Sequence, residues 1–148
     1  MEEYIKNIDI QVIPAQTLAF IGDAVYNVYI RTYLASISTA KTGALHRLSI
    51  KYVSAKGQAM CIDNIMDLLT EEEIAVYKRG RNTNIATVSK NVDVVEYKKS
   101  IGFECLIGYL YLEGKKKRID EIFEYFKEFV GEIVWNNIFM EKILWWNL

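Results

Sequence analysis

A single proline, Pro14, interrupts the 148 residues of this chain, and only eight glycines accompany it. An all-β sandwich needs a turn roughly every 8–12 residues, and such turns are built largely from glycine and proline. The sequence therefore argues against an all-β fold. With 51% hydrophobic and 25% charged residues, the chain has the composition of an ordinary globular protein rather than a disordered one.

Apolar residues recur at helical spacing along nearly the whole chain. One buried helix face is expected to carry Leu18, Ile21, Val25, Val28 and Tyr29, with Thr17 as the N-cap of that helix. Further helices are expected over residues 42–69 with a bend or end at Gly57, over 70–78, over 93–113, from Asp120 onwards, and over the apolar tail 133–148. The sequence thus predicts an all-α fold of six or seven helices, with residues 1–148 forming one domain.

Local signals mark where several of these helices begin and end. Thr70 with Glu73, and Asp93 with Glu96, have the spacing of a capping box, in which two side chains and two backbone N–H groups satisfy one another. Gly114 is the expected stop after the second of these helices. Residues 80–92 are polar and lack periodicity, which predicts a loop.

Gly22 lies inside the first long predicted helix, in the segment GDAV. A glycine at such a position costs stability relative to alanine. We therefore expect Gly22 to permit another helix to approach closely. The chain contains no glycine-rich phosphate-binding loop of the Walker or dinucleotide type.

The charge is unevenly distributed, although 18 Lys and Arg residues nearly balance 19 Asp and Glu residues. Residues 78–118 contain ten basic residues and four acidic ones, so we expect one basic surface on an otherwise acidic body. Local clusters of this kind bind phosphate groups. The sharper cluster is KRGRN at 78–82, whereas KKKR at 115–118 is equally well explained as a solvated turn.

The cysteines and the single histidine limit the chemistry that is available. Cys61 and Cys105 both lie in apolar segments, which is typical of reduced, buried thiols in a cytosolic protein. His46 is the only histidine, which excludes a His-rich zinc site. No segment has the form of a secretory signal or reaches the ~20 apolar residues of a membrane span, so we expect a cytoplasmic protein without a membrane contact.

Two acidic residues occur where the apolar pattern predicts burial. Asp23 follows LAFIG, and Glu104 is the only charged residue in IGFECLIGYLYL. Ionised carboxylates rarely enter apolar helix faces unless they are paired or bind a metal. Because histidine and cysteine ligands are scarce, carboxylate oxygens here favour Mg²⁺ or Mn²⁺. The alternative is that both acids form structural ion pairs.

Two motifs in this order resemble those of the ribonuclease III family. Residues 18–25, LAFIGDAV, resemble the family's signature helix LEFLGDAVL, and residues 103–112, FECLIGYLYL, resemble its later helix (F/V)EALIGAIYLD. KRGRN at 78–82 and VSKN at 88–91 look like the bacterial form that consists of the catalytic domain alone. The resemblance covers nearly the whole chain, so we expect a protein without a separate double-stranded-RNA-binding domain.

The resemblance implies a ribonuclease III endonuclease fold and a magnesium-dependent endoribonuclease that cuts double-stranded RNA, with Mn²⁺ as a substitute metal. Asp23 and Glu104 would be the metal ligands and catalytic residues. The family forms homodimers through its signature helix, which makes Phe20 a candidate dimer contact, with a place in the core of its own chain as the alternative. The cellular substrate would be precursor 23S ribosomal RNA, with a large-subunit ribosomal protein as a further partner. The expected RNA-binding residues are Lys78, Arg79, Arg81, Asn82 and Lys90.

The sequence departs from the family's usual four acids at the metal site. Ala19 and Ile101 stand where two of the acids are expected, and Gln16 replaces a further acid of the longer signature. With fewer carboxylates, more of the magnesium shell must come from water or phosphate oxygen. A rival interpretation is therefore a catalytically silent RNA-binding or assembly module. Retention of both Asp23 and Glu104 in apolar helices favours the enzyme.

Overall fold

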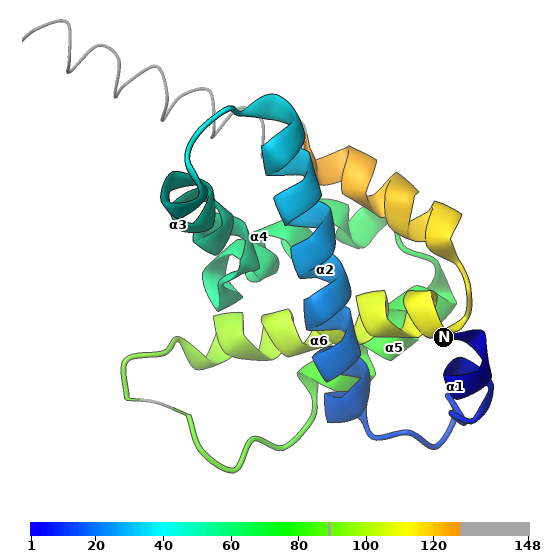
Figure 1. The fold of residues 1–148 in the computed structure, drawn as a ribbon. Coiled ribbons are helices and arrows are strands. Elements are labelled where there is room, and N and C mark those ends of the chain that lie inside the picture. Colours follow the sequence, from blue (N-terminus) through cyan, green and yellow to red (C-terminus); the bar gives the residue numbers. More distant parts are fainter. Residues whose placement is uncertain (89, 128–148) are drawn as a thin grey trace, which may run out of the picture.

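The computed structural model describes residues 1–88 and 90–127, and this part of the chain is helical without strands. The elements in chain order are α1 (Glu2–Lys6), α2 (Ala15–Ile37), α3 (Thr42–Val53), α4 (Ala55–Ile65), a 3₁₀ turn (Met66–Leu68), α5 (Glu71–Arg81) and α6 (Val94–Leu112). Residues 116–127 form a further helix, drawn in orange-yellow in Figure 1. The expected all-α fold is confirmed. The apolar tail predicted as a last helix, with Trp145 and Trp146, lies outside the described residues.

Predicted start and stop signals of α5 and α6 that involve residues within one helix turn are found in the structure. Thr70 and Glu73 form the complete capping box at the start of α5. The predicted Asp93–Glu96 capping box is formed only in part: Asp93 accepts hydrogen bonds from the backbone N–H groups of Val95 and Glu96 at the start of α6, without the return bond from the Glu96 side chain. Gly114 follows α6 with a φ of 70°, a left-handed conformation that glycine adopts without strain.

Other predicted helix boundaries were wrong. The N-cap of α2 is Pro14 rather than Thr17, since proline fits at a helix entry where its missing N–H is not needed. The break between α3 and α4 falls at Ser54, whose hydroxyl caps α4, so Gly57 lies in the first turn of α4. Asp120 lies inside the helix of residues 116–127 instead of capping it.

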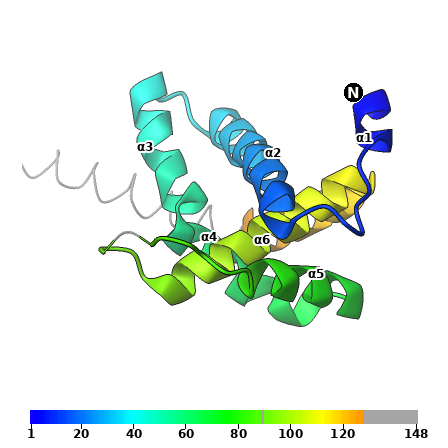
Figure 2. The ribbon, with the colours of Figure 1, turned by 90° about the horizontal axis from the view of Figure 1, so that it is seen from below.

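Helix α6 forms the centre of the molecule. It packs against α2 on one side and α5 on the other, and α4 contacts it as well. Figure 2 shows α2 and α5 on opposite sides of α6, with α2 crossing it at a steep angle. Ten residues of α6 are buried, among them the fully buried Phe103, Leu106 and Leu110. Phe103 meets the ring of Tyr26 from α2 edge-on at 4.9 Å, which joins the two helices through an aromatic core.

Two glycines let the backbones of α2 and α6 approach closely where the two helices cross. A Cβ atom added at Gly22 would lie 1.8 Å from the Glu104 carbonyl oxygen, and one added at Gly108 would lie 2.0 Å from the Leu18 carbonyl oxygen. Neither distance is possible for real atoms, so the two backbones touch directly at this crossing. The close approach predicted from Gly22 is confirmed.

A similar contact joins α5 to α6. A Cβ atom at Gly80 would lie 2.7 Å from the Cβ of Cys105, and one at Gly102 would lie 2.6 Å from the ring of Tyr77. Gly80 was expected to begin a loop, but α5 continues to Arg81. The packing against α6 explains this difference, because it holds the last turn of α5 against the core.

The last residue of the basic run at 115–118 is part of the structural framework. Arg118 donates from Nε to Glu73 Oε1 at 2.7 Å and from Nη2 to Glu73 Oε2 at 3.0 Å, and Nη2 also donates to the Leu68 carbonyl at 2.8 Å. Glu73 is only 5% exposed. Burial raises the pKa of Glu73, but the hydrogen bonds from Arg118 and Thr70 outweigh it and leave the pKa below its usual value. Arg118 therefore neutralises a buried carboxylate and ties helix 116–127 to α5.

Within the described residues, no helix is long and apolar enough to cross a membrane.

The glycine crossing generates a stability prediction. Gly22→Ala forces α2 and α6 apart, and we expect it to lower the free energy of unfolding by about 2 kcal/mol or more, the cost of overpacking a tight core. Equilibrium unfolding in urea at fixed protein concentration measures the change. Gly43→Ala is the matched control, because the nearest atom to an added Cβ there is a flexible Arg47 nitrogen at 3.8 Å. Equal stability of the two variants would contradict the prediction.

Candidate active site

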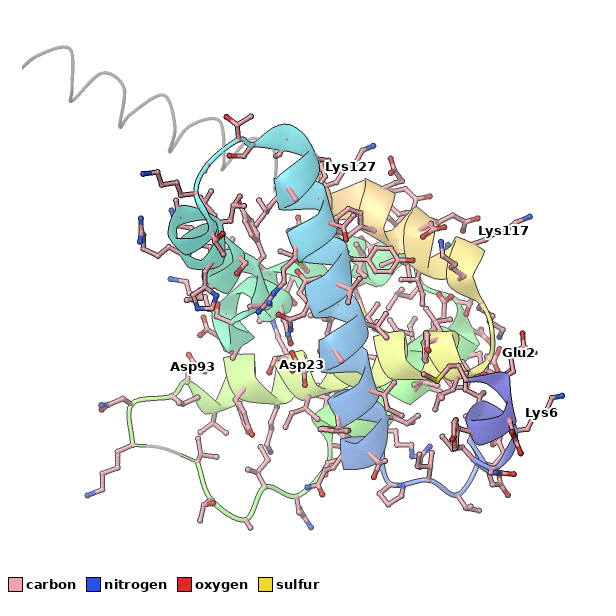
Figure 3. The ribbon with its side chains drawn as sticks, in the orientation of Figure 1. Glu2, Lys6, Asp23, Asp93, Lys117 and Lys127 are labelled. Atoms are coloured by element: carbon pink, nitrogen blue, oxygen red, sulfur yellow. The ribbon has the colours of Figure 1, made fainter. Side chains whose placement is uncertain are left out.

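The two candidate carboxylates come together at the glycine crossing. Asp23 directly follows Gly22 on α2, and Gly22 rests on the backbone of Glu104 in α6. The negative charge of Asp23 contributes to raising the pKa of Glu104, after the larger effect of burial. Figure 3 places Asp23 beside the crossing of α2 and α6. Residues 81 positions apart in the sequence are thus neighbours because two helices meet without intervening side chains.

Asp23 is exposed, although the apolar pattern predicted burial. The buried face of α2 consists of Leu18, Ala19, Gly22, Tyr26, Ile30 and Leu34. Asp23 lies beside that face, as does Val28, a predicted core residue that is 63% exposed. Asp23 Oδ1 accepts a hydrogen bond of 2.9 Å from Nδ2 of Asn27, and the same Nδ2 donates to the Asp23 carbonyl. This pairing within one helix turn holds the carboxylate at the surface of α2.

Glu104 is partly buried, as its surroundings predicted. Burial raises the pKa of Glu104 to about 7, a hydrogen bond from the Gln58 side chain opposes that rise, and the nearby Asp23 adds to it. A carboxyl group with such a pKa exchanges its proton near neutral pH and gains from a cation that neutralises it. Shifts of this size from burial and a charged neighbour are typical of functional sites.

The donor set suits a hard divalent cation. Two neighbouring carboxylates repel one another when both are ionised, and an oxygen-binding cation removes that repulsion. The part of the chain described here has no group of three or more His, Cys, Asp and Glu residues placed to hold a metal. The positions of the missing acids explain this, since Ala19 is buried in the core and Ile101 is a partly buried apolar residue of α6.

The predicted RNA-binding residues lie at the end of α5 and in the loop that follows. Lys78, Asn82 and Lys90 are exposed. Arg81 stacks over the Tyr77 ring, with Cζ 5.6 Å from its centroid, and its Nε donates to Asn82 Oδ1 at 3.2 Å. Arg79 donates a hydrogen bond to the Ile13 carbonyl just before α2. The two arginines are therefore held in place by the protein, whereas the two lysines are free to reach outward.

The KKKR run differs from this cluster because most of its charge is paired internally. Lys115 lies 3.8 Å from Glu72, Lys116 lies 3.2 Å from Asp120, and Arg118 is bound to Glu73. Figure 3 shows Lys117 on the opposite side of α2 from Asp23. This run is thus a poor candidate for the RNA-binding surface.

The sequence analysis missed a second basic surface. Residues 24–62 contain no acidic residue, a signal that counting charges by segment would have found. The exposed basic residues of this stretch at and near α3 are Lys41, Arg47, Lys51 and Lys56, and His46 is exposed beside them. In Figure 3, α3 and its side chains lie on the same side of α2 as Asp23.

One edge of α2 is apolar and exposed. Phe20 is 79% exposed and Val28 is 63% exposed, with the exposed Ala24 between them one helix turn from each. An adjoining pocket of about 430 Å³ is lined mainly by apolar side chains, including those of Val25, Tyr111 and Ile119. The alternative that Phe20 lies in the core of its own chain is therefore wrong, and the dimer contact stays a prediction.

Comparison with known proteins agrees with this geometry. Residues 16–115 match the Ribonuclease III domain, a segment that contains both carboxylates and the glycine crossing. The chain therefore belongs to the ribonuclease III family. Within that family it groups with the proteins named Mini-ribonuclease 3.

Three similar proteins illustrate the extent of the match. Mini-ribonuclease 3 of Enterococcus faecalis is 46% identical over 117 residues, covering 78% of this chain and 89% of that protein. Mini-ribonuclease 3 of Thermoanaerobacter sp. is 48% identical over 107 residues, covering 72% and 75% respectively. The crystal structure of a Fusobacterium nucleatum protein superposes with a TM-score of 0.71 at 29% identity, covering 87% of this chain and 98% of that one.

Family membership fixes the class of activity. The chain is an endoribonuclease of the ribonuclease III family. Members of this family act on double-stranded RNA, generally form dimers and generally depend on a divalent metal.

Proposed function

We propose that residues 1–148 form one catalytic domain that hydrolyses double-stranded RNA with Mg²⁺ bound by Asp23 and Glu104. Mn²⁺ is expected to substitute for Mg²⁺. The observation that carries the proposal is the glycine crossing, which brings Asp23 of α2 next to the segment of α6 that carries Glu104. The cellular substrate that we propose is precursor 23S ribosomal RNA in the cytoplasm, cut in the paired stem that joins its ends, with a large-subunit ribosomal protein presenting the stem.

The chemistry divides between the cation and the protein. When bound, Mg²⁺ supplies charge neutralisation at the scissile phosphate and activates a water molecule, leaving 5′-phosphate and 3′-hydroxyl ends. Asp23, exposed and held by Asn27, is the ligand that faces the RNA. Glu104 is the deeper ligand, and its raised pKa means that it releases a proton as the cation binds near neutral pH.

Only two carboxylates supply protein ligands at this site. Mg²⁺ prefers six oxygen ligands, so most of its shell must come from water and from phosphate oxygens of the substrate. We therefore expect weak binding of the cation to the free protein and tighter binding in the presence of RNA.

The duplex is held by basic and polar residues in two parts of the chain. Lys78, Arg79, Arg81, Asn82 and Lys90 lie at the end of α5 and in the loop after it, and the other basic residues lie at α3 and its ends. Double-stranded RNA is recognised through its shape, its phosphates and its 2′-hydroxyls, for which such a surface is suited.

The exposed edge of α2 supports a homodimer. In a two-fold symmetric contact the same patch meets itself, so a side chain that protrudes needs a recess close by. Phe20 is the protruding residue, and the pocket lined by Val25, Tyr111 and Ile119 is the recess. Two sites related in this way can cut the two strands of one duplex.

A catalytically silent module is the rival function. Such a module needs the basic surface but not two neighbouring acids, one of them partly buried in apolar surroundings. The retained pair favours the enzyme, because an unneutralised buried carboxylate destabilises the fold.

The first prediction concerns Asp23. Asp23→Asn removes one charge and one metal ligand, and we expect it to lower the cleavage rate by about a thousandfold or more, corresponding to roughly 4 kcal/mol of lost metal stabilisation. Cleavage of an end-labelled RNA duplex, with Mg²⁺ or with EDTA, measures the effect, and duplex binding is read on the same gel. Asp67→Asn is the control, since Asp67 is exposed and lies on the short 3₁₀ turn. Undiminished cutting by Asp23→Asn would remove the metal-site assignment.

The second prediction concerns the RNA surface. Replacing both Lys78 and Lys90 with alanine should weaken duplex binding and lower the slope of log affinity against log salt by about 2, one for each lost phosphate contact. The binding of duplex RNA to the Asp23→Asn variant, measured at several salt concentrations, avoids cleavage during the titration. Lys117→Ala serves as the control, because that exposed lysine lies on the opposite side of α2 from Asp23. An unchanged slope would place the RNA elsewhere.

The third prediction concerns the dimer. Phe20→Ser should weaken self-association by about 30-fold or more, the effect expected when a central aromatic anchor is lost. Sedimentation equilibrium across a range of protein concentrations measures this, with Tyr125→Ser as the control for loss of an exposed aromatic residue on helix 116–127. Identical association of the two variants would rule out the proposed contact.

A further inference from the structure

The last turn of α5 lies directly on the backbone of α6. A Cβ atom added at Gly80 would lie 2.9 Å from the Cα of Gly102, so no side chain separates the two helices there. Gly102 has no space for a Cβ either, because that atom would lie 2.6 Å from the ring of Tyr77. The ring of Tyr77 therefore rests on the α6 backbone two residues before Glu104.

Tyr77 is fixed by its surroundings. It is 1% exposed and is among the largest fully buried side chains of the described residues. Side chains in a close-packed interior of this kind occupy one well-defined orientation. The position of the Tyr77 ring is thus set by the packing of α5 on α6.

The side chain of Arg81 lies over this ring. Arg81 is the last residue of α5 and follows Tyr77 by four positions, which places both residues on one face of the helix. Its Cζ is 5.6 Å from the ring centroid, within the ~6 Å over which a cation is attracted to an aromatic face. Arg81 Nε also donates to Asn82 Oδ1 at 3.2 Å. The half-buried guanidinium is therefore held by two contacts.

The charge of Arg81 differs from that of its structural neighbours. Lys99 of α6 donates to both carboxylate oxygens of Asp63 at 2.8 Å, and Arg118 is bound to Glu73. Within the described part of the chain, Arg81 forms no ion pair with a carboxylate. A guanidinium without an acidic partner is suited to a phosphate group, which it binds through two parallel hydrogen bonds.

A guanidinium that is already held in place binds a phosphate more tightly than a free one. A long arginine side chain has many rotamers in solution, and fixing it in one of them costs conformational entropy. When a binding partner has to impose that order, the cost is subtracted from the affinity. The ring of Tyr77 removes part of this cost before RNA arrives.

We propose that Tyr77 is a positioning residue, which holds the guanidinium of Arg81 ready to bind a phosphate of the RNA duplex. This inference rests on the proposed function, in which Arg81 contacts the duplex. It assigns a role in RNA binding to a core residue that does not itself reach the RNA. Tyr77 acts through Arg81, and its orientation comes from the contact with Gly102.

The test measures duplex binding in the Asp23→Asn background, where no cleavage disturbs the titration. Tyr77→Leu removes the ring but keeps the charge of Arg81, and we expect the affinity to fall about fivefold, as for the loss of a cation–π contact. Arg81→Ala should lower the slope of log affinity against log salt by about 1. When Arg81→Ala is already present, Tyr77→Leu should cause no further loss of affinity, since residues that act as one unit are not additive.

Two variants separate this role from a loss of packing. Tyr77→Phe keeps the ring and should bind the duplex as tightly as the parent. Phe126→Leu is the matched control, because Phe126 is also 1% exposed but its ring packs on those of Phe103 and Phe123. It should leave duplex affinity unchanged. If Tyr77→Leu does not fold, as judged by circular dichroism, Tyr77→Met replaces it, since methionine fills irregular spaces in a core.

The outcomes distinguish this inference from the proposed function. An equal loss of affinity from Tyr77→Leu with and without Arg81 would mean a structural role alone and would overturn the inference. Undiminished affinity in the folded Tyr77→Leu or Tyr77→Met variant would overturn it too, as would a wild-type salt slope in Arg81→Ala. None of these results affects the metal site, which is tested by cleavage. If the wild type binds the duplex but does not cut it, the proposed enzyme fails, and the comparison with and without Arg81 still decides the role of Tyr77.

Discussion

The direct contact between the backbones of α2 and α6 is the constraint on which the rest of the structure depends. Neither Gly22 nor Gly108 has space for one added carbon atom, so the crossing has a single separation. Asp23 and Glu104 are placed by that separation, and so is the edge-on contact between the rings of Tyr26 and Phe103. The aromatic core and the candidate active site are two sides of the same contact.

The candidate active site costs free energy of folding within this framework. Glu104 is an acid in apolar surroundings beside a second acid, and both effects raise its pKa. The other buried acid, Glu73, has a dedicated arginine instead, and its pKa is lowered. In the proposed function, this contrast distinguishes a carboxylate that stabilises the fold from one that binds a positively charged ligand.

Features set by neighbouring residues could be predicted from the sequence, and features set by distant ones could not. The Thr70 cap and the Gly114 stop depend on residues within one turn, and both predictions were confirmed. The exposure of Asp23 was missed because α2 has a second apolar edge, around Phe20, that periodicity cannot distinguish from the core. Arg118 pairs with Glu73, 45 residues earlier. That pairing leaves no pattern in the sequence.

The internal pairing of the KKKR run has a consequence for self-recognition. A two-fold contact places each surface against an identical copy, so any uncompensated charge near the axis faces its own sign. Lys116 borders the pocket beside the apolar edge of α2, and Asp120 neutralises it within the same chain. Lys115 and Arg118 are balanced in the same way by Glu72 and Glu73. A segment that looks strongly cationic in the sequence is therefore close to neutral where two copies would meet, and like-charge repulsion does not oppose their association.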